Sequence, residues 1–339
     1  MIRTCRRLLV VGMTVAFAVT AACGRAPATG RAPVRISVGG QNQLLYLPTT
    51  LAQQLGFYRD EGLDVTIEDF AGGSKALEAL VGGSADVVSG FYDHTIQMAA
   101  EGRELVAFVT MLRYPGLVLA SPPAALGGVS RIEDLKGRIA GVTAAGSSTQ
   151  MMLTYLLQKH GVPPDGVAVT AIGVSATAIA AMEHGSVAAG MMAEPAFTLA
   201  QQRHADLRIL ADLRTGDGVK AAFGTSMYPG AVLYSTGDWI RGHRYTAAGL
   251  ARAVRRTLEW MQAHTPAEIA AKMPESFRGG DDALYIAALG HAMPMYSPDG
   301  VMSADGAEIV HRLLAESMAS VRNAKIDLTK TYTNELLKR

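Results

Sequence analysis

Short segments with the pattern of β-strands alternate with helical segments, and this alternation restricts the fold more than any other feature of the sequence. Strands are expected at residues 34–39, 65–68, 85–89, 105–111, 117–120, 138–142, 167–172 and 188–192. Helices are expected between them at residues 47–55, 75–81, 94–100, 149–160 and 176–184, with a helical turn at 132–137. Such alternation predicts an α/β fold in which helices connect parallel strands.

A weak internal repeat suggests that this α/β pattern occurs twice. Residues 73–87 and 174–188 each contain a loop, a helix, a tight turn and a strand. Two lobes built on one βαβ design would produce such a repeat. From residue 245 onward the pattern is mostly helical, and we expect these C-terminal helices to pack against the first lobe.

The N-terminus has the layout of an export signal. Arg3, Arg6 and Arg7 precede an apolar run at residues 8–19, which is too short to span a bilayer, and small residues lead to Cys23. The last residues resemble a bacterial lipobox, so residues 1–23 are interpreted as a signal peptide and Cys23 as a lipidation site. Simple cleavage of the signal remains the alternative. Residues 24–33 are rich in Ala, Pro and Gly and are expected to form a flexible tether.

Composition excludes several classes of protein. The only cysteines are Cys5 and Cys23, so the body of the protein is expected to lack disulfides and thiolate metal sites. The formal net charge of +1 gives no basic stripe for binding nucleic acid. The histidines show no metal-ligand spacing, and no cofactor is expected.

An ordered set of short motifs resembles the bacterial ABC-type solute-binding proteins for nitrate, sulfonates and taurine, whose superfamily also includes binders and enzymes of thiamine-pyrimidine metabolism. The motifs are residues 34–38, 47–65, 73–74, 83–87, 132–140 and 146–148, followed by Glu194-Pro195. The resemblance implies a type II periplasmic-binding-protein fold. One lobe would comprise residues 34–114 and 236–339 and the other residues 115–235, with crossings near 114–116 and 226–235 and a cleft that closes by hinge motion.

The resemblance also implies a function and a location. The protein would be a monomer outside the cytoplasm, in the periplasm or at the outer face of the cytoplasmic membrane, held there by its lipid anchor. It would capture a small molecule and deliver it to the permease and ATPase subunits of an ABC importer. No catalysis is expected.

Two loops that open helices are candidate anion sites, because free N–H groups and a partial positive charge lie at a helix N-terminus. They are residues 71–74 and 145–149, one in each expected lobe. Ordinary helix capping is the alternative. The resemblance favours ligand contact for Ser147 and Ser148. The full set of candidate ligand-binding residues is Gln41, Leu44, Tyr46, Gly73, Ser74, Phe91, Tyr92, Asp93, His94, Gly146, Ser147, Ser148, Thr149, Glu194 and Tyr228.

The charged candidates point to different ligands. Arg113 could neutralise an anion, whereas Asp93 and Glu194 in one pocket would favour an amine or a nitrogenous ring. A sulfonate or carboxylate is therefore the first expectation and a thiamine-pyrimidine-like ring the second.

The chain lacks the sequence motifs of several classes of enzyme. It contains no dinucleotide fingerprint, phosphate loop or Gly-x-Ser-x-Gly elbow. A pyrimidine synthase with the related fold carries a cysteine-rich iron motif, which cannot occur here because no cysteine follows Cys23. A protein that keeps the fold but has a cleft plugged by large apolar side chains remains a further alternative.

Overall fold

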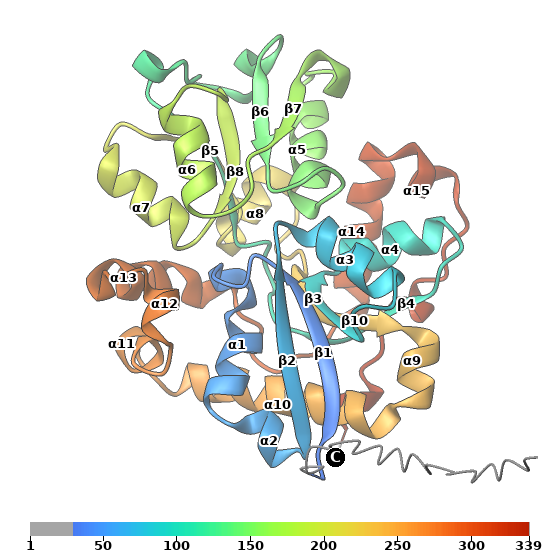
Figure 1. Cartoon of the computed structure of the whole chain (residues 1–339). Helices are drawn as coiled ribbons and strands as arrows, with labels where there is room; N and C mark the ends of the chain where they lie inside the picture. The colour runs from blue at the N-terminus through green and yellow to red at the C-terminus, as the bar shows by residue number, and fades with distance from the viewer. Residues whose placement is uncertain (1–29, 339) are drawn as a thin grey trace, which may run out of the picture. The chain divides into compact units, whose positions relative to one another are not determined.

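The computed structural model describes residues 30–338. The expected signal peptide, the lipidation site at Cys23 and residues 24–29 of the expected tether lie outside this range. Residues 31–339 form one compact unit. It contains two five-stranded sheets, which Figure 1 shows one above the other, with helices packed on each.

The first sheet has the strand order β2-β1-β3-β10-β4. Its strands are β1 (Ala32–Gly39), β2 (Leu63–Phe70), β3 (Val87–Phe91), β4 (Leu105–Thr110) and β10 (Ala231–Thr236). Parallel pairing joins β1 to β2 and β3, while β10 runs antiparallel to both β3 and β4. β3 and β4 are mostly hydrophobic and do not alternate with polar residues, because every residue of both strands is buried.

The second sheet repeats this topology with the order β7-β6-β8-β5-β9. Its strands are β5 (Leu117–Ser121), β6 (Ile139–Val142), β7 (Ala168–Ala171), β8 (Ala189–Ala193) and β9 (Arg208–Asp212). Here β5 is the antiparallel strand, in the place that β10 takes in the first sheet. The internal repeat of the sequence corresponds to equivalent parts of the two sheets, since each copy leads through a helix into the central strand β3 or β8.

Helices cover both sheets. Those between the strands are α1 (Leu47–Gln54), α2 (Phe57–Asp60), α3 (Gly73–Val81), α4 (Asp93–Ala100), α5 (Ser148–Lys159), α6 (Ala176–Glu183), α7 (Ala196–Arg203) and α8 (Gly216–Phe223). After β10 follow α9 (Gly237–Gly242), α10 (Arg244–Gln262), α11 (Pro266–Ala270), α12 (Glu275–Arg278), α13 (Asp282–Ala292), α14 (Ala304–Ser317) and α15 (Ala319–Asn323). The two-lobed α/β architecture expected from the sequence is confirmed.

The polypeptide crosses between the two lobes at two places. The chain leaves the first sheet after β4 and enters the second with β5, and it returns between α8 and β10. Two expected boundaries differ from the structure. β1 begins at Ala32, inside the expected tether, and β10 belongs to the first sheet although residues 231–235 were assigned to the second lobe.

The C-terminal helices contact both lobes rather than the first alone. α10 packs on α1, α2 and β4 of the first lobe, as expected. α14 contacts α5, and α13 contacts α7, so the tail also touches the second lobe. The strands β9 and β10 and the helices α8 and α9 were not predicted, and β9 is a partly exposed edge strand without strong alternation.

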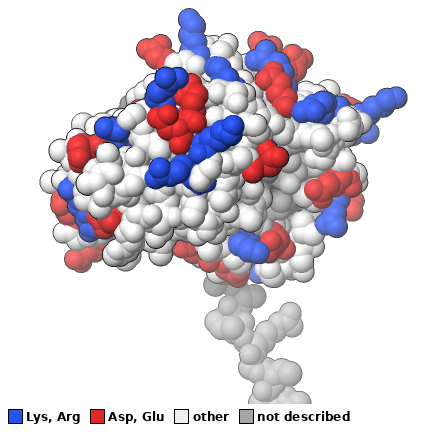
Figure 2. Space-filling view, turned by 90° about the horizontal axis from the view of Figure 1, so that it is seen from above, with Lys and Arg blue, Asp and Glu red and all other residues white. Residues whose placement is uncertain are grey.

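Charge on the surface is mixed. The face in Figure 2 carries acidic and basic side chains interspersed, with no large field of one sign on the described part visible there. This distribution agrees with the near-neutral net charge. Over residues 30–338, none of the helices has both the length and the apolar character needed to cross a bilayer.

Candidate functional site

Two helix N-termini from different lobes meet at the interface between the sheets. α3 of the first lobe begins at Gly73 and α5 of the second begins at Ser148. The backbone N–H of Ser74 donates to Ser147 Oγ over 3.2 Å, and Ser74 Oγ donates to the carbonyl of Ala145 over 2.7 Å. Gly72 is the N-cap of α3, and Ser74 lies in the first turn of that helix. Its hydroxyl is therefore free to reach the other lobe.

Glycines allow this close approach. A Cβ on Gly39, at the end of β1, would lie 2.4 Å from the carbonyl carbon of Gly72. A Cβ on Gly72 would lie 2.9 Å from the Cβ of Ala144 in the second lobe. Both distances are too short for real side-chain atoms, so the absence of side chains at these positions sets how near the two helix N-termini can come.

A small cavity of about 20 Å³ lies beside these helix ends. Six candidate residues line it together: Tyr46, Gly73, Phe91, Ser147, Ser148 and Thr149. Sequence reasoning missed five others, which are Gly39, Gln43, Leu45, Leu117 and Thr143. A volume of this size holds about one water molecule, so the lobes must separate before a larger ligand can enter.

Asp93 is fully buried next to this cavity. Its carboxylate accepts a hydrogen bond of 2.6 Å from Ser148 Oγ of the second lobe and one of 3.4 Å from the hydroxyl of Tyr228. Burial raises the pKa of Asp93, and these hydrogen bonds together with nearby His94 offset only part of that effect. The neutral carboxylic acid is thereby favoured, which makes Asp93 a possible donor as well as an acceptor.

His94 is buried beside Asp93. Its Nδ1 lies 3.3 Å from the hydroxyl of Tyr234, whereas Nε2 has no hydrogen-bond partner among the described residues. Burial lowers the pKa of His94, so the ring is neutral at physiological pH. The ring also lies close to the N-terminus of α3, because a Cβ on Gly73 would lie 3.2 Å from the ring carbon Cε1.

Several candidates do not line the cavity. The hydroxyl of Tyr92 bonds Thr331 over 2.5 Å, and its ring packs edge-on against Tyr332 of the C-terminal segment. Gln41 donates to the hydroxyl of Thr50. Leu44 contributes backbone rather than side-chain contacts between the lobes. The remaining candidate of this group, Gly146, adopts a positive φ of 75° in the turn before α5.

Glu194 is already paired. Its side chain is 1% exposed and lies 2.7 Å from the guanidinium of Arg214, which also binds Asp212. The other carboxylate oxygen accepts from the backbone N–H of Thr198 at the start of α7. Asp93 and Glu194 therefore do not form the shared acidic pocket that the sequence suggested. Arg214 was missed, since nothing local in the sequence links it to a residue twenty positions earlier.

Arg113 also has a partner. Its Nε donates to the carbonyl of Pro294 over 2.9 Å, and its guanidinium lies over the ring of Tyr114. The cation expected near the first crossing thus binds the C-terminal region. No cluster of His, Cys, Asp and Glu that could hold a metal ion occurs among residues 30–338.

Comparisons with known proteins give a consistent picture. The family model described as "NMT1/THI5 like" matches residues 45–269. A protein of Bordetella bronchiseptica RB50 with a solved structure is 40% identical, with a TM-score of 0.85 over 91% of this chain and 96% of its own. YtlA of Bacillus subtilis (strain 168), a candidate binding protein by its name, is 22% identical over 288 residues, which is 81% of each chain.

A more distant structure shows the same fold. The alkanesulfonate-binding protein SsuA from Xanthomonas axonopodis pv. citri, solved with bound MOPS, has a TM-score of 0.67 and 19% identity over 90% of this chain and 99% of its own. At this identity the likeness establishes the fold alone. The expectation of a periplasmic-binding-protein fold is thereby confirmed.

Proposed function

The chain belongs to the NMT1/THI5-like family, and from this premise we propose that it is an extracytoplasmic solute-binding lipoprotein that captures a sulfonate or carboxylate for an ABC importer. The lobes separate to admit the ligand and close around it, without catalysis. The closed form then docks as a monomer on the permease, whose ATPase subunits drive import, while Cys23 carries the lipid anchor.

The observation that carries this proposal is the meeting of two helix N-termini at one cavity. α3 and α5 come from different lobes, and their first N–H groups have no acceptor within their own helices. Together with the hydroxyls of Ser147 and Thr149, which line the cavity, they supply donors and positive potential to one small volume. An oxyanion group would replace the hydrogen bonds that Ser74 and Ser147 make to each other.

The acidic neighbour is compatible with an anion. Burial raises the pKa of Asp93, which widens the pH range of its neutral form, and that form can donate a hydrogen bond to an anion. Glu194 is paired with Arg214, a guanidinium that it shares with Asp212. The bound MOPS in the distant relative SsuA contains a sulfonate, which supports the same class of ligand for this chain.

A nitrogenous ring is the second candidate, because two aromatic side chains line the cavity. Tyr46 and Phe91 pack edge to face, with centroids 6.4 Å apart. They could flank a pyrimidine, and Asp93 could bind a ring nitrogen or an amino group. Pyrimidines therefore belong in the same binding assay.

The proposal can be tested by thermal unfolding of residues 31–339, the compact unit, with sulfonates, carboxylates, nitrate and pyrimidines. A ligand at one hundred times its Kd stabilises the folded state by about 2.7 kcal/mol and should raise Tm by several degrees. We expect alkanesulfonates or carboxylates to give this shift and Ser147→Ala to abolish most of it.

Ser186→Ala is the matched control, because Ser186 is exposed in the same lobe and does not line the cavity. It should respond to ligand as the unmodified protein does. A shift with pyrimidines alone would favour the second candidate. A sulfonate shift that persists in Ser147→Ala would contradict the proposed site.

A further inference from the structure

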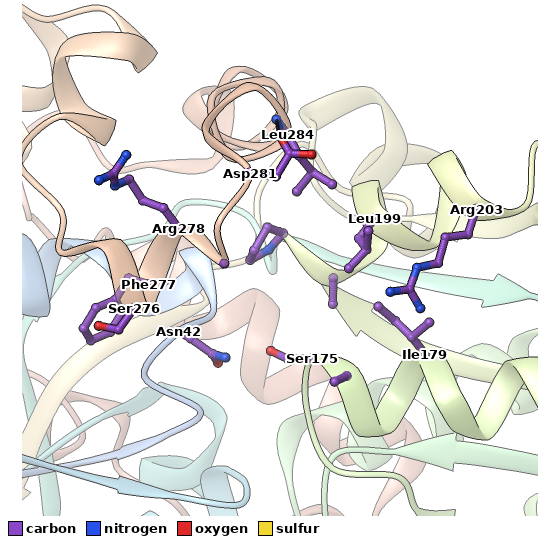
Figure 3. A pocket seen from close by; sticks show the side chains of 14 residues that line it. Asn42, Ser175, Ile179, Leu199, Arg203, Ser276, Phe277, Arg278, Asp281 and Leu284 are labelled. Atoms are coloured by element: carbon purple, nitrogen blue, oxygen red, sulfur yellow. Dashed lines mark hydrogen bonds between the residues drawn. The ribbon is translucent and has the colours of Figure 1, made fainter.

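A second and much larger pocket lies on another side of the interface between the lobes. Its volume is about 250 Å³. α6 and α7 of the second lobe form one wall, and the segment from α12 to the start of α13 forms the other, with Asn42 from the loop after β1 (Figure 3). None of its lining residues lines the serine-rich cavity.

The walls of this pocket are largely apolar. Ile179 and Leu199 come from the second lobe, and Phe277 and Leu284 come from the C-terminal helices. Pockets that bind small molecules typically combine such walls with a few placed polar groups. A ligand with an apolar body would bury that surface.

Three buried polar atoms of lining residues have no partner among the described residues. They are Oδ1 of Asn42, Oγ of Ser175 and Nε of Arg278. Figure 3 shows the side chains of Asn42 and Ser175 pointing toward each other from opposite lobes. Buried polar groups are nearly always hydrogen-bonded, so such atoms at one apolar pocket indicate a missing polar partner.

The two arginines at the rim have acidic partners, since Arg203 pairs with Glu183 and Arg278 with Asp282. The carboxylate of Asp281 accepts from the backbone N–H of Leu284 as the N-cap of α13, where the positive end of the helix dipole offsets part of its charge. These rim residues therefore do not call for a charged group on the ligand. An uncharged ligand fits this balance.

We propose that this pocket is a second ligand site, separate from the serine-lined cavity, for a small uncharged amphipathic molecule. Its polar end both donates and accepts hydrogen bonds, as a primary amide or a hydroxyl group does. The N–H or O–H of that group donates to Asn42 Oδ1, and the Ser175 hydroxyl donates to the oxygen of the same group. The apolar body lies against Ile179, Leu199 and Leu284.

The test uses residues 31–339 with pentanamide and 1-pentanol as probes and pentanoate as the charged analogue. Binding is detected by saturation-transfer NMR, and the Kd of each compound is obtained by titrating it into the protein. We expect saturable binding of pentanamide or 1-pentanol and at least fivefold weaker binding of pentanoate. Leu199→Trp fills the pocket and Ser175→Ala removes one polar partner, so each should weaken probe binding at least fivefold.

Ser186→Ala and Ser147→Ala are the controls, and both should bind the probes as the unmodified protein does. Thermal unfolding without probe checks that each variant is folded, and Ser175→Ala stands alone if Leu199→Trp is not. Absence of saturable binding would overturn the proposal, as would unchanged binding in the folded pocket variants. Loss of probe binding in Ser147→Ala would assign the probes to the cavity instead, and this result is separable from the sulfonate assay.

Discussion

At the scale of single residues, Glu194 connects the two lobes through groups that the sequence does not place together. Its carbonyl accepts from the backbone N–H of Leu44 in the first lobe, while its carboxylate is bound by Arg214 in the second. His291 of α13 approaches the same carboxylate at 3.8 Å. Glu194 is thus better described as a junction between the lobes than as an open ligand contact.

We expect Arg214→Met to destabilise the protein strongly. Glu194 is 1% exposed, and removing its partner would leave a buried charge uncompensated, which costs about 3–5 kcal/mol. Chemical denaturation of residues 31–339 measures this loss. Arg241→Met is the control, because Arg241 and its partner Glu104 are largely exposed, and its effect should be much smaller. Equal losses in the two variants would contradict the assigned role of the buried pair.

At the scale of elements, the distance between β1 and α3 determines the shape of the cavity. Gly39 ends β1, and Gly72 precedes the first residue of α3. Their backbones touch so closely that no side chain fits between them. The donors of α3 reach the second lobe only because of this contact.

Gly39→Ala should destabilise the protein and weaken ligand binding together. The new Cβ would meet backbone atoms at 2.4 Å, so the end of β1 or the start of α3 must move, at a cost of about 1–3 kcal/mol. Denaturation and the sulfonate titration measure the two effects. Gly242→Ala has open space around its Cβ and should change neither. If Gly39→Ala left sulfonate binding unchanged, ligand binding would not depend on the position of α3.

The elements also show why prediction succeeded in some places and failed in others. Helices such as α5 and α10 were predicted because their apolar periodicity is local. Residues 231–235 were placed in the second lobe, although as part of β10 they pair with β3 and β4, which are distant in sequence. Gly-Ser loops before helices identified Ser147 and Ser148, whereas the Glu194–Arg214 pair and the second pocket arise only from tertiary packing.

Tyr92 illustrates a related limit at the site itself. The sequence placed it beside Phe91 as a second aromatic of the cleft. Phe91 is the last residue of β3 and lines the cavity, whereas Tyr92 already has helical backbone angles as the N-cap of α4 and packs on the C-terminal segment. The point at which the strand gives way to the helix decides which of the two aromatic residues faces the cavity, and the local pattern did not determine that point.

At the scale of the whole molecule, the structure is a closed arrangement held by contacts across the interface. Ser74 bonds Ser147, Ser148 bonds Asp93, and Leu44 bonds Glu194. α13 and α14 add contacts from the C-terminal region to the second lobe. Opening must break these contacts while the two chain crossings persist, which is the geometry of a hinge.

A disulfide between the lobes should lock this arrangement. The hydroxyl oxygens of Ser74 and Ser147 lie 3.3 Å apart, so Ser74→Cys combined with Ser147→Cys places two thiols within bonding reach. Residues 31–339 contain no other cysteine. Because both substitutions remove proposed ligand donors, the readout is opening without ligand: we expect the backbone amides at the interface to exchange hydrogen much more slowly in the oxidised double variant than in the reduced one.

Each single cysteine variant serves as the control and should be insensitive to reductant. If the oxidised double variant forms the bond and its interface amides still exchange at the rate of the reduced form, the lobes do not separate at this point.

The position of β10 has a consequence for how the protein is made. Among the five strands of its sheet, β4 pairs only with β10, and a bridge between Ala107 and Tyr332 joins its other edge to the C-terminal segment. About 120 residues separate β4 from β10 along the chain. A ribosome therefore completes all five strands of the second sheet before it supplies the strand that joins β3 to β4. The second lobe can therefore fold first. In the first lobe, the edges of β3 and β4 that pair with β10 remain unpaired until β10 is synthesised.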